Sequence, residues 1–214
     1  MNIGEMIDKA IVRHEELHHV IEVTPEQIML AAEQLVAAGY LPDYDQNAHF
    51  RLSRYVAMHK AGDRRGLFLF GNCGTGKTMF ARKFTTRRFF TATAIVERYE
   101  KYGASVGFDE WLHGNYTDEH VKTPPVDVVI DDLGAEPVSK RYGEVRELLA
   151  DVIDRRYRYW QDYGRECVTV ITSNLSSPAL KQRYGMRTID RICEMCVAIE
   201  FKGRSARVAA MKGA

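Results

Sequence analysis

One stretch of eight residues decides the fold, Gly71-Asn72-Cys73-Gly74-Thr75-Gly76-Lys77-Thr78. It fits the pattern G-x-x-x-x-G-K-[ST] at every fixed position. The glycines let the backbone turn tightly and point N–H groups at phosphate oxygens, and the following helix adds its dipole. In such a loop Lys77 places a charge on the β- and γ-phosphates, and the Thr78 hydroxyl ligates Mg²⁺. The stretch from Gly71 to Met79 is therefore predicted to bind ATP and Mg²⁺.

The sequence around this loop alternates between strands and helices. Apolar runs predict strands at residues 67–70, 89–94, 126–130, 167–172 and 197–201. Helical spacing predicts helices at residues 77–88, 95–102 and 144–163, followed by two short helices at 178–184 and 188–193. Such alternation implies a five-stranded parallel sheet with helices on both faces, an α/β fold of the P-loop αβα sandwich type.

Before the loop the pattern is helical. Helices are predicted at residues 3–21, 25–38 and 51–60; the second has a capping box at Thr24 and Gln27 and stops at Gly39. We therefore divide the chain into a helical N-terminal region, residues 1–62, and an ATPase domain, residues 63–214. The first region carries nine acidic and five basic residues, which suits docking of a basic partner.

Composition excludes several other classes. The chain has 214 residues, 45% of them hydrophobic, and a formal net charge of +1, so overall charge gives no argument for nucleic acid. Four cysteines in a chain of this length do not make a disulfide scaffold. We find no signal peptide and no apolar run long enough to span a membrane, so we expect no membrane association and a cytoplasmic location.

Polar residues follow two of the predicted strands. Asp131 and Asp132 end the strand at 126–130, where ligands bind in open α/β sheets. We expect Asp131 to hold Mg²⁺ through water and Asp132 to orient or deprotonate the attacking water. Aspartate is roughly 1.5 Å shorter than the glutamate often found there, so Glu136 is an alternative that shares the role. Asn174 follows the next buried strand and is expected to reach the γ-phosphate or this water.

Five motifs together resemble one family. The P-loop, Ile130-Asp131-Asp132-Leu133-Gly134-Ala135-Glu136 and Thr172-Ser173-Asn174-Leu175 resemble the AAA+ ATPases of the DnaC/DnaI helicase-loader and IstB transposition-helper group. Tyr184-Gly185-Met186-Arg187-Thr188-Ile189-Asp190-Arg191 and Gly203-Arg204-Ser205-Ala206-Arg207 resemble its closing motifs. The resemblance covers roughly residues 66–208 and implies a RecA-like AAA+ fold. Because 13 residues follow the last predicted strand, we expect no C-terminal lid domain.

The resemblance also implies roles for arginines. Arg191 matches the arginine finger, which stabilises transition-state charge in a neighbouring subunit, with Arg187 as an alternate. Arg207 matches the sensor-2 arginine that contacts the phosphates from the same chain. If Arg191 is a finger, the complete site lies between two protomers and the active form is a homo-oligomer.

The implied partners are DNA, expected to be single-stranded, and a replicative helicase or a transposase. Candidate DNA contacts are the basic pairs Arg82-Lys83, Arg87-Arg88, Lys140-Arg141 and Arg155-Arg156. For the helix at 144–163 we favour buried aromatics and solvated charges over DNA binding. The leading hypothesis is a helicase loader. The alternatives are a transposition helper of the IstB type and a nucleotide-held scaffold with negligible hydrolysis, which Asp132 in place of glutamate keeps open.

Overall fold

A five-stranded sheet forms the centre of the computed structural model, which describes residues 21–40, 45–84, 88–103, 127–141, 144–163 and 167–205. The strands, in the order β2-β3-β6-β1-β7, are β2 (Phe89–Thr91), β3 (Val128–Asp131), β6 (Thr169–Ser173), β1 (Gly66–Gly71) and β7 (Cys196–Phe201). Every neighbouring pair is parallel. The predicted RecA-like αβα fold with five parallel strands is therefore confirmed.

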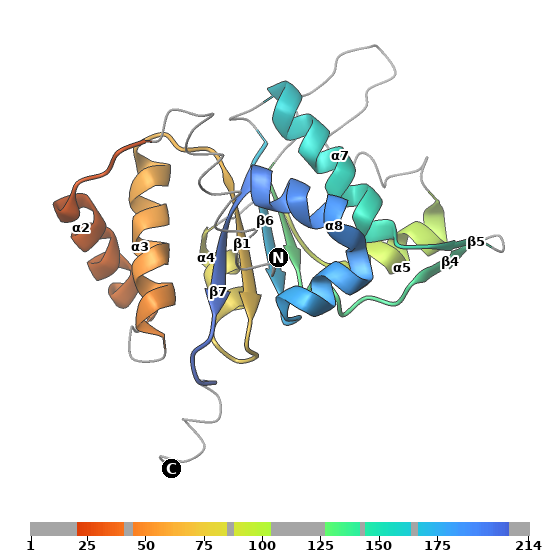
Figure 1. Cartoon of the computed structure of the whole chain (residues 1–214), viewed down its shortest axis with the longest axis horizontal. Helices are drawn as coiled ribbons and strands as arrows, with labels where there is room; N and C mark the ends of the chain where they lie inside the picture. The colour runs from red at the N-terminus through yellow and green to blue at the C-terminus, as the bar shows by residue number, and fades with distance from the viewer. Residues whose placement is uncertain are drawn as a thin grey trace.

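Helices cover both faces of this sheet (Figure 1). Helices α3 (Gln46–Lys60) and α4 (Lys77–Phe84) pack on one face, and α5 (Ala92–Tyr102), α7 (Leu148–Tyr163) and α8 (Ser177–Met195) pack on the other. Strand β1 shows the cause, because successive side chains point to opposite faces. Leu67 and Leu69 enter the core beneath α3 and α4, whereas Phe68 and Phe70 enter the core beneath the other three helices. An uninterrupted apolar strand thus serves two cores.

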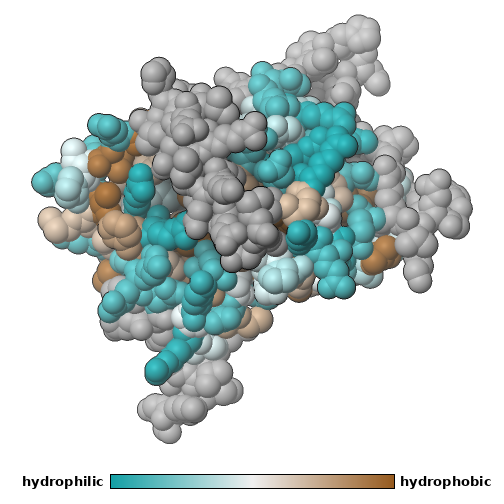
Figure 2. Space-filling model, viewed as in Figure 1, coloured by the Kyte–Doolittle hydropathy of each residue, from teal (hydrophilic) through white to brown (hydrophobic). Residues whose placement is uncertain are grey.

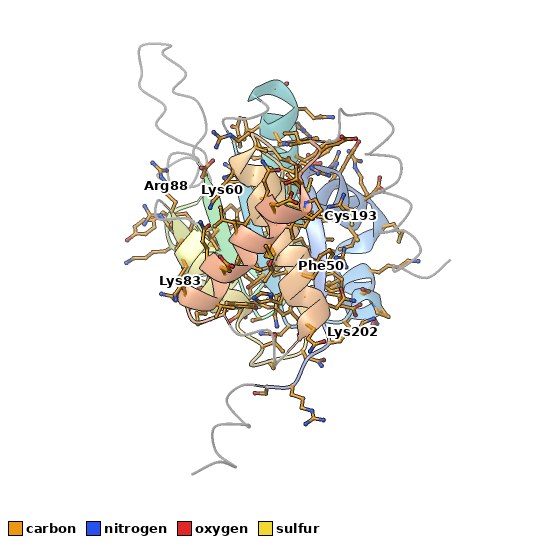
Figure 3. All side chains as sticks on the ribbon, turned by 90° about the vertical axis from the view of Figure 1, so that its left-hand side faces the viewer. Phe50, Lys60, Lys83, Arg88, Cys193 and Lys202 are labelled. Carbon is orange, nitrogen blue, oxygen red and sulfur yellow. The ribbon has the colours of Figure 1, made fainter. Side chains whose placement is uncertain are left out.

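The N-terminal helices stand to one side of the sheet. Helix α2 (Pro25–Ala37) packs across the outer side of α3, in front of it when the molecule is seen from that side (Figure 3). The predicted capping box is present, with Gln27 N–H donating to Thr24 Oγ1 at 3.3 Å and Thr24 N–H donating to Gln27 Oε1 at 2.8 Å. Gly39 follows the helix with φ 84°. The helix predicted at residues 3–21 lies almost entirely outside the described residues.

Several predicted boundaries were wrong because side chains cap or kink the chain. Helix α3 begins at Gln46 rather than residue 51, since Asp45 Oδ1 accepts the N–H of Ala48 at 3.0 Å. The strand predicted at 89–94 ends at Thr91, whose hydroxyl accepts the N–H of Ala94 at 3.1 Å and starts α5. Other predicted strand ends shift by one or two residues.

The segment before α7 also differs from the prediction. Residues 144–146, which we assigned to the start of one long helix, form instead the strand β5 (Glu144–Arg146), which pairs antiparallel with β4 (Ser139–Arg141). The two short helices predicted after β6 are the two halves of α8, which kinks at Gly185 with φ 77° and ψ 164°. Helix α4 is described as far as Phe84, short of the predicted end at residue 88.

Parallel pairing brings the polar segments together. Strands β1, β3 and β6 end at one edge of the sheet, and the P-loop, Asp131-Asp132 and Asn174 follow at that edge. This is the edge where open α/β sheets bind ligands. No helix in the described ranges is long and apolar enough to cross a membrane.

Candidate functional site

The P-loop turns from β1 into α4 with a backbone that favours glycine. Gly71, Gly74 and Gly76 have φ values of 109°, 74° and 92°, in the region that residues with a Cβ rarely adopt. Space is also tight: a Cβ on Gly71 would lie 2.4 Å from the carbonyl oxygen of Phe201. A Cβ on Gly74 would lie 2.2 Å from Ser205 Oγ. The loop is therefore built around glycine, and the chain after β7 lies directly against it.

Lys77 is held within this loop. Its side chain is 5% exposed, and Nζ donates to the carbonyl oxygens of Gly71 at 3.1 Å and Asn72 at 2.6 Å. Burial lowers the pKa of Lys77, while Cys73 and the carboxylates of Asp132 and Asp131 oppose that shift. The ammonium is thus pre-positioned at the loop, where the motif predicts its contact with phosphate.

The predicted magnesium ligands lie next to each other. Thr78 Oγ1 donates to Asp131 Oδ1 at 2.9 Å, and Thr172 Oγ1 donates to the same oxygen at 2.6 Å. Asp131 is 3% exposed. A hydroxyl beside a carboxylate suits Mg²⁺. Thr78 lines the cavity described below, whereas Asp131 is not among its lining residues and reaches it through Thr78. Among the described residues, no group of three or more His, Cys, Asp or Glu gathers as an alternative metal site.

Asp132 and Asn174 contact each other. Asn174 Nδ2 donates to Asp132 Oδ1 at 2.8 Å. Asp132 has φ 57° and is the one non-glycine residue with positive φ in the part of the chain that the structure describes. Its N–H donates to Thr172 Oγ1 at 2.9 Å, so the hydroxyl of one threonine fixes both neighbouring aspartates. Strain at a functional turn persists where such contacts determine it.

These residues line one cavity of about 460 Å³. Residues 73–79, Asp132 and Asn174 form one wall, and Gly39, Tyr40, Asp45 and Phe201 form the other. The second wall was missed from the sequence. Tyr40 donates its hydroxyl to the carbonyl oxygen of Thr75 at 3.1 Å, and its ring packs edge-on against Phe201 at 6.4 Å. Two aromatic side chains beside a phosphate loop suit the base and ribose of a nucleotide.

Asp45 ties the second wall to the end of β7. Its Oδ2 accepts the N–H groups of Lys202 at 2.8 Å and Gly203 at 2.7 Å, while its Oδ1 caps α3. Asn72 Nδ2 in the P-loop donates to the carbonyl oxygens of the same two residues, at 3.0 and 3.2 Å. The start of α3, the P-loop and the chain after β7 are thus bonded into one rim.

Replacing Tyr40 tests the second wall. Tyr40→Phe leaves the ring in place and removes the bond to Thr75, so we expect the free energy of unfolding to fall by about 1 kcal/mol. We also expect ATP affinity to fall by about threefold, since Thr75 belongs to the P-loop. Thermal unfolding and titration with a fluorescent ATP analogue measure the two effects.

The matched control is Tyr55→Phe. Tyr55 is 1% exposed and donates its hydroxyl to the carbonyl oxygen of Arg65 at 2.9 Å, a bond outside the cavity. Tyr55→Phe should lower the free energy of unfolding by a similar amount and leave ATP affinity unchanged. Equal ATP affinities for wild type, Tyr40→Phe and Tyr55→Phe would remove Tyr40 from the binding site.

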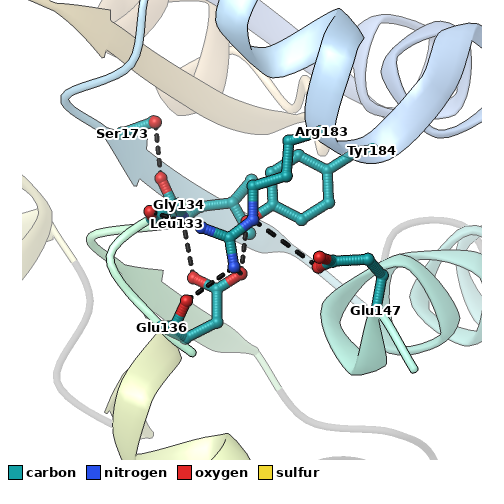
Figure 4. Close-up of polar contacts among 7 residues, drawn as sticks. All are labelled: Leu133, Gly134, Glu136, Glu147, Ser173, Arg183 and Tyr184. Atoms are coloured by element: carbon teal, nitrogen blue, oxygen red, sulfur yellow. Dashed lines mark hydrogen bonds and ion pairs between the residues drawn. The ribbon is translucent and has the colours of Figure 1, made fainter. Parts of the chain in front are cut away.

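The expectation that Glu136 shares the catalytic-base role was wrong. Glu136 is 3% exposed and does not line the cavity. Its carboxylate accepts the N–H of Gly134 at 2.8 Å, contacts Arg183 Nη2 at 3.0 Å and accepts the Tyr184 hydroxyl (Figure 4). A carboxylate held by three donors inside the protein has no oxygen facing an attacking water. Asp132 remains the candidate base.

The structure places Arg191 against its own chain. It lies on the second half of α8, forms an ion pair with Asp154 of α7 and has its guanidinium 5.3 Å from the ring centroid of Tyr157. Arg187 is exposed on the same segment. A finger acts on a neighbouring subunit, so the role of Arg191 stays a prediction. Arg207 lies outside the described residues, two positions after Ser205, which contacts the P-loop region at Gly74.

In the candidate DNA pair Arg155-Arg156, Arg155 is exposed but Arg156 is not available to DNA. Arg156 is fully buried and donates to Thr169 Oγ1 at 2.9 Å and to the carbonyl oxygen of Val168 at 3.1 Å. Burial lowers its pKa, and Asp127 opposes the shift. Tyr157 and Trp160 are partly buried against the core, as the interpretation with buried aromatics predicted. That interpretation also expected solvated charges, which was wrong for Arg156. Of the other candidates, Arg87 and the side chains of Lys140 and Arg141 lie outside what the structure describes.

The strand order and the P-loop together define the fold class, a P-loop αβα sandwich of the RecA-like (AAA+) type. Strand β6 lies between the P-loop strand β1 and the strand β3 that carries Asp131, and the polar ends of all three strands meet at one cavity. This agrees with the family resemblance seen in the sequence.

Comparisons with known proteins agree with this class. The chain is similar to chaperone protein ClpB of Pseudomonas putida, 31% identical over 147 residues that make up 61% of this chain and 17% of that protein. It is 29% identical over 154 residues to ClpB of Vibrio vulnificus, with coverage of 64% and 17%. The chain thus spans less than a fifth of the length of these curated relatives.

One solved structure in the comparison is the crystal structure of the DnaC helicase loader. It has a TM-score of 0.43 and 21% sequence identity, and the match covers 87% of this chain and 95% of that chain. No family model matches the sequence. The class assignment therefore rests on the strand order and the site.

Proposed function

We propose that this protein is a Mg²⁺-dependent ATPase that associates with DNA and acts as a replicative helicase loader. The ATPase proposal is supported by the hydrogen bonds between Thr78 and Asp131 and between Asn174 and Asp132, next to Lys77. The loader role is supported by the motifs of the sequence, which resemble the DnaC/DnaI and IstB group. A homo-oligomer with shared ATP sites and a cytoplasmic location belong to the same proposal.

The residues of the site have distinct tasks in this proposal. The P-loop N–H groups and Lys77 bind the β- and γ-phosphates. Thr78 and Asp131 would hold Mg²⁺, which would supply positive charge to the phosphate oxygens. Asp132 accepts a proton from the attacking water, and Asn174 orients both the carboxylate and that water. The Tyr40 wall receives the base.

A second candidate is a nucleotide-held scaffold with negligible hydrolysis. Two observations favour it: the candidate base is the short side chain of Asp132, and Glu136 is engaged inside the protein and cannot substitute for it. ATP turnover with and without single-stranded DNA separates the two candidates. A protein that binds ATP but never exceeds background turnover, even when assembled on DNA, is a scaffold.

The N-terminal region is proposed as the docking surface for the partner. Its described part, residues 21–40 and 45–62, carries an apolar groove between α2 and α3 lined by Pro25, Ile28, Met29, Ala32, Gln46, His49, Phe50 and Ser53. Met29 is 62% exposed and Phe50 57% exposed. Hydrophobic surface is visible over these helices (Figure 2). The same region also supplies Tyr40 and Asp45 to the cavity of the ATPase domain, residues 63–214, which would link docking to nucleotide.

Co-elution with the replicative helicase of its own source tests the loader role. The protein and helicase are mixed with ATP, with ADP and without nucleotide, and then passed over a sizing column. We expect a stable complex whose amount depends on the nucleotide. If no complex forms and the protein instead forms ATP-dependent filaments on DNA, the loader role is wrong and the alternative of an IstB-like transposition helper takes its place.

A further inference from the structure

The turn after β3 carries Asp132 in a conformation that the chain must hold against its own preference. Asp132 has φ 57°, and Gly134 two residues later has φ 102°. A Cβ on Gly134 would lie 2.4 Å from the side chain of Leu175, the residue after Asn174. The turn is therefore pressed against the end of β6. Its shape determines where the Asp132 carboxylate meets Asn174.

Backbone bonds to β6 hold the near side of this turn. Leu133 N–H donates to the carbonyl oxygen of Thr172 at 2.8 Å, and Ser173 Oγ donates to the carbonyl oxygen of Leu133 at 2.6 Å. Ser173 Oγ also accepts the N–H of Leu175 at 3.1 Å. These bonds fix the turn up to Leu133. They do not reach the far side, where the chain leaves the site.

Glu136 and helix α8 hold the far side. The Glu136 carboxylate closes back on the turn by accepting the N–H of Gly134. Arg183 Nη1 donates to the carbonyl oxygen of Gly134 and Nη2 donates to that of Glu136, each at 2.6 Å (Figure 4). Arg183 and the Tyr184 hydroxyl also contact the Glu136 carboxylate. Burial and this carboxylate raise the pKa of Tyr184, so its hydroxyl stays a donor.

A surface turn does not need a buried carboxylate with an arginine and a tyrosine as partners. A buried carboxylate is costly unless it is paired and its oxygens are hydrogen-bonded. Here the pairing joins two segments 47 residues apart, the turn and the last residues of α8 before its kink at Gly185. Removal of one partner would leave a buried charge without compensation.

We propose that Glu136 is a positioning residue: with Arg183 and Tyr184 it locks the turn that carries Asp132 onto α8, and it thereby sets the rate of ATP hydrolysis but not nucleotide affinity. The inference rests on the ATPase function proposed above. The split between rate and affinity follows from the position of the contacts that Glu136, Arg183 and Tyr184 make. They reach Asp132 through the turn, and none of the three side chains lines the cavity or contacts the P-loop through a described bond. A small displacement of a group that orients water costs much more in rate than in binding.

Two variants test the proposal. Glu136→Gln keeps the size of the side chain but turns one accepting oxygen into an NH₂ group, so it cannot satisfy Gly134 and the α8 donors together. We expect kcat to fall about 10- to 100-fold, with ATP affinity within about threefold of wild type. Tyr184→Phe removes one donor and should lower kcat by about threefold, with the same affinity.

Glu147→Gln is the matched control. Glu147 contacts the same arginine, with its Oε2 3.5 Å from Arg183 Nε, but makes no described bond to the turn. Its kcat should equal that of wild type. Steady-state ATP hydrolysis gives kcat and KM, a fluorescent ATP analogue gives affinity, and thermal unfolding shows that each variant is folded.

The outcomes separate the inference from the function on which it rests. If wild type binds no ATP or does not hydrolyse it, the proposed ATPase is wrong. If wild type is active and a folded Glu136→Gln matches its kcat, or loses affinity and kcat in equal measure, the positioning role is wrong. Where Glu136→Gln does not fold, Tyr184→Phe decides by the same criteria.

Discussion

Lys77→Ala is expected to lose ATP binding, with affinity lower by about 100-fold or more. The ammonium is the one side-chain charge that the P-loop itself directs at the phosphates, and alanine supplies neither charge nor donor. Lys77 Nζ bonds in the protein to the carbonyl oxygens of Gly71 and Asn72, within the loop itself. The substitution therefore removes a binding group without breaking a link between distant elements. Titration with a fluorescent ATP analogue in the presence of Mg²⁺ measures the loss.

Lys60→Ala is the control for this change. Lys60 is exposed on α3, bonds to Gln34 of α2 and does not line the cavity. Its affinity for ATP should equal that of wild type. Thermal unfolding should show Lys77→Ala to be folded, because Phe80 and Ala81, the core residues of α4, are untouched. A folded Lys77→Ala that binds ATP within threefold of wild type would contradict the assignment of the P-loop as the ATP site.

The candidate site residues that the sequence could point to are those whose signal is local. The P-loop is recognised from eight consecutive residues, and Asp131-Asp132 and Asn174 are recognised because each follows an apolar run. Since parallel strands end at one edge, the topology alone brings these residues together. The contact between Asn174 and Asp132, 2.8 Å, is a consequence that the pattern could anticipate.

The residues that sequence analysis misread have partners far along the chain. Glu136 looks like a free acidic residue after a strand, and its burial depends on Arg183 and Tyr184, 47 and 48 residues away. Arg156 stands in a basic run but is buried, because Thr169 at the start of β6 and Val168 just before it accept its N–H groups. Arginine is rarely fully buried, so the residue type alone predicts an exposed side chain at this position. Tyr40 enters the cavity only through the packing of the N-terminal helices on the sheet.

Arg191→Ala is expected to keep ATP affinity and to lose partner- or DNA-stimulated hydrolysis by about 1,000-fold, the low end of the effect of an arginine finger. Within one protomer Arg191 pairs with Asp154 and lies over the ring of Tyr157, with 18% of its side chain exposed. The alternative to a finger is therefore a purely structural role, in which Arg191 holds α8 against α7. The measurement is ATP turnover of the assembled protein with and without single-stranded DNA.

Asp154→Asn separates these roles, because it breaks the same ion pair and leaves Arg191 in place. Asp154 also pairs with Arg158 at 2.5 Å, so Arg158→Ala serves as a second control for that contact. If the ion pair alone matters, Asp154→Asn and Arg191→Ala will lose activity to the same extent. If Arg191 acts in a neighbouring site, Asp154→Asn will keep most of its stimulated activity. Equal losses in the two variants would end the finger assignment.

Mixing two inactive variants gives the sharpest form of this test. A Lys77→Ala protomer cannot bind ATP but still carries Arg191, whereas an Arg191→Ala protomer binds ATP but lacks the finger. In a mixed oligomer, the first can donate its arginine to the ATP held by the second, so we expect stimulated hydrolysis to return in part. An active mixture means that the complete site lies between two protomers. A mixture as inactive as its components, in oligomers shown to contain both chains, means that Arg191 does not act across the interface.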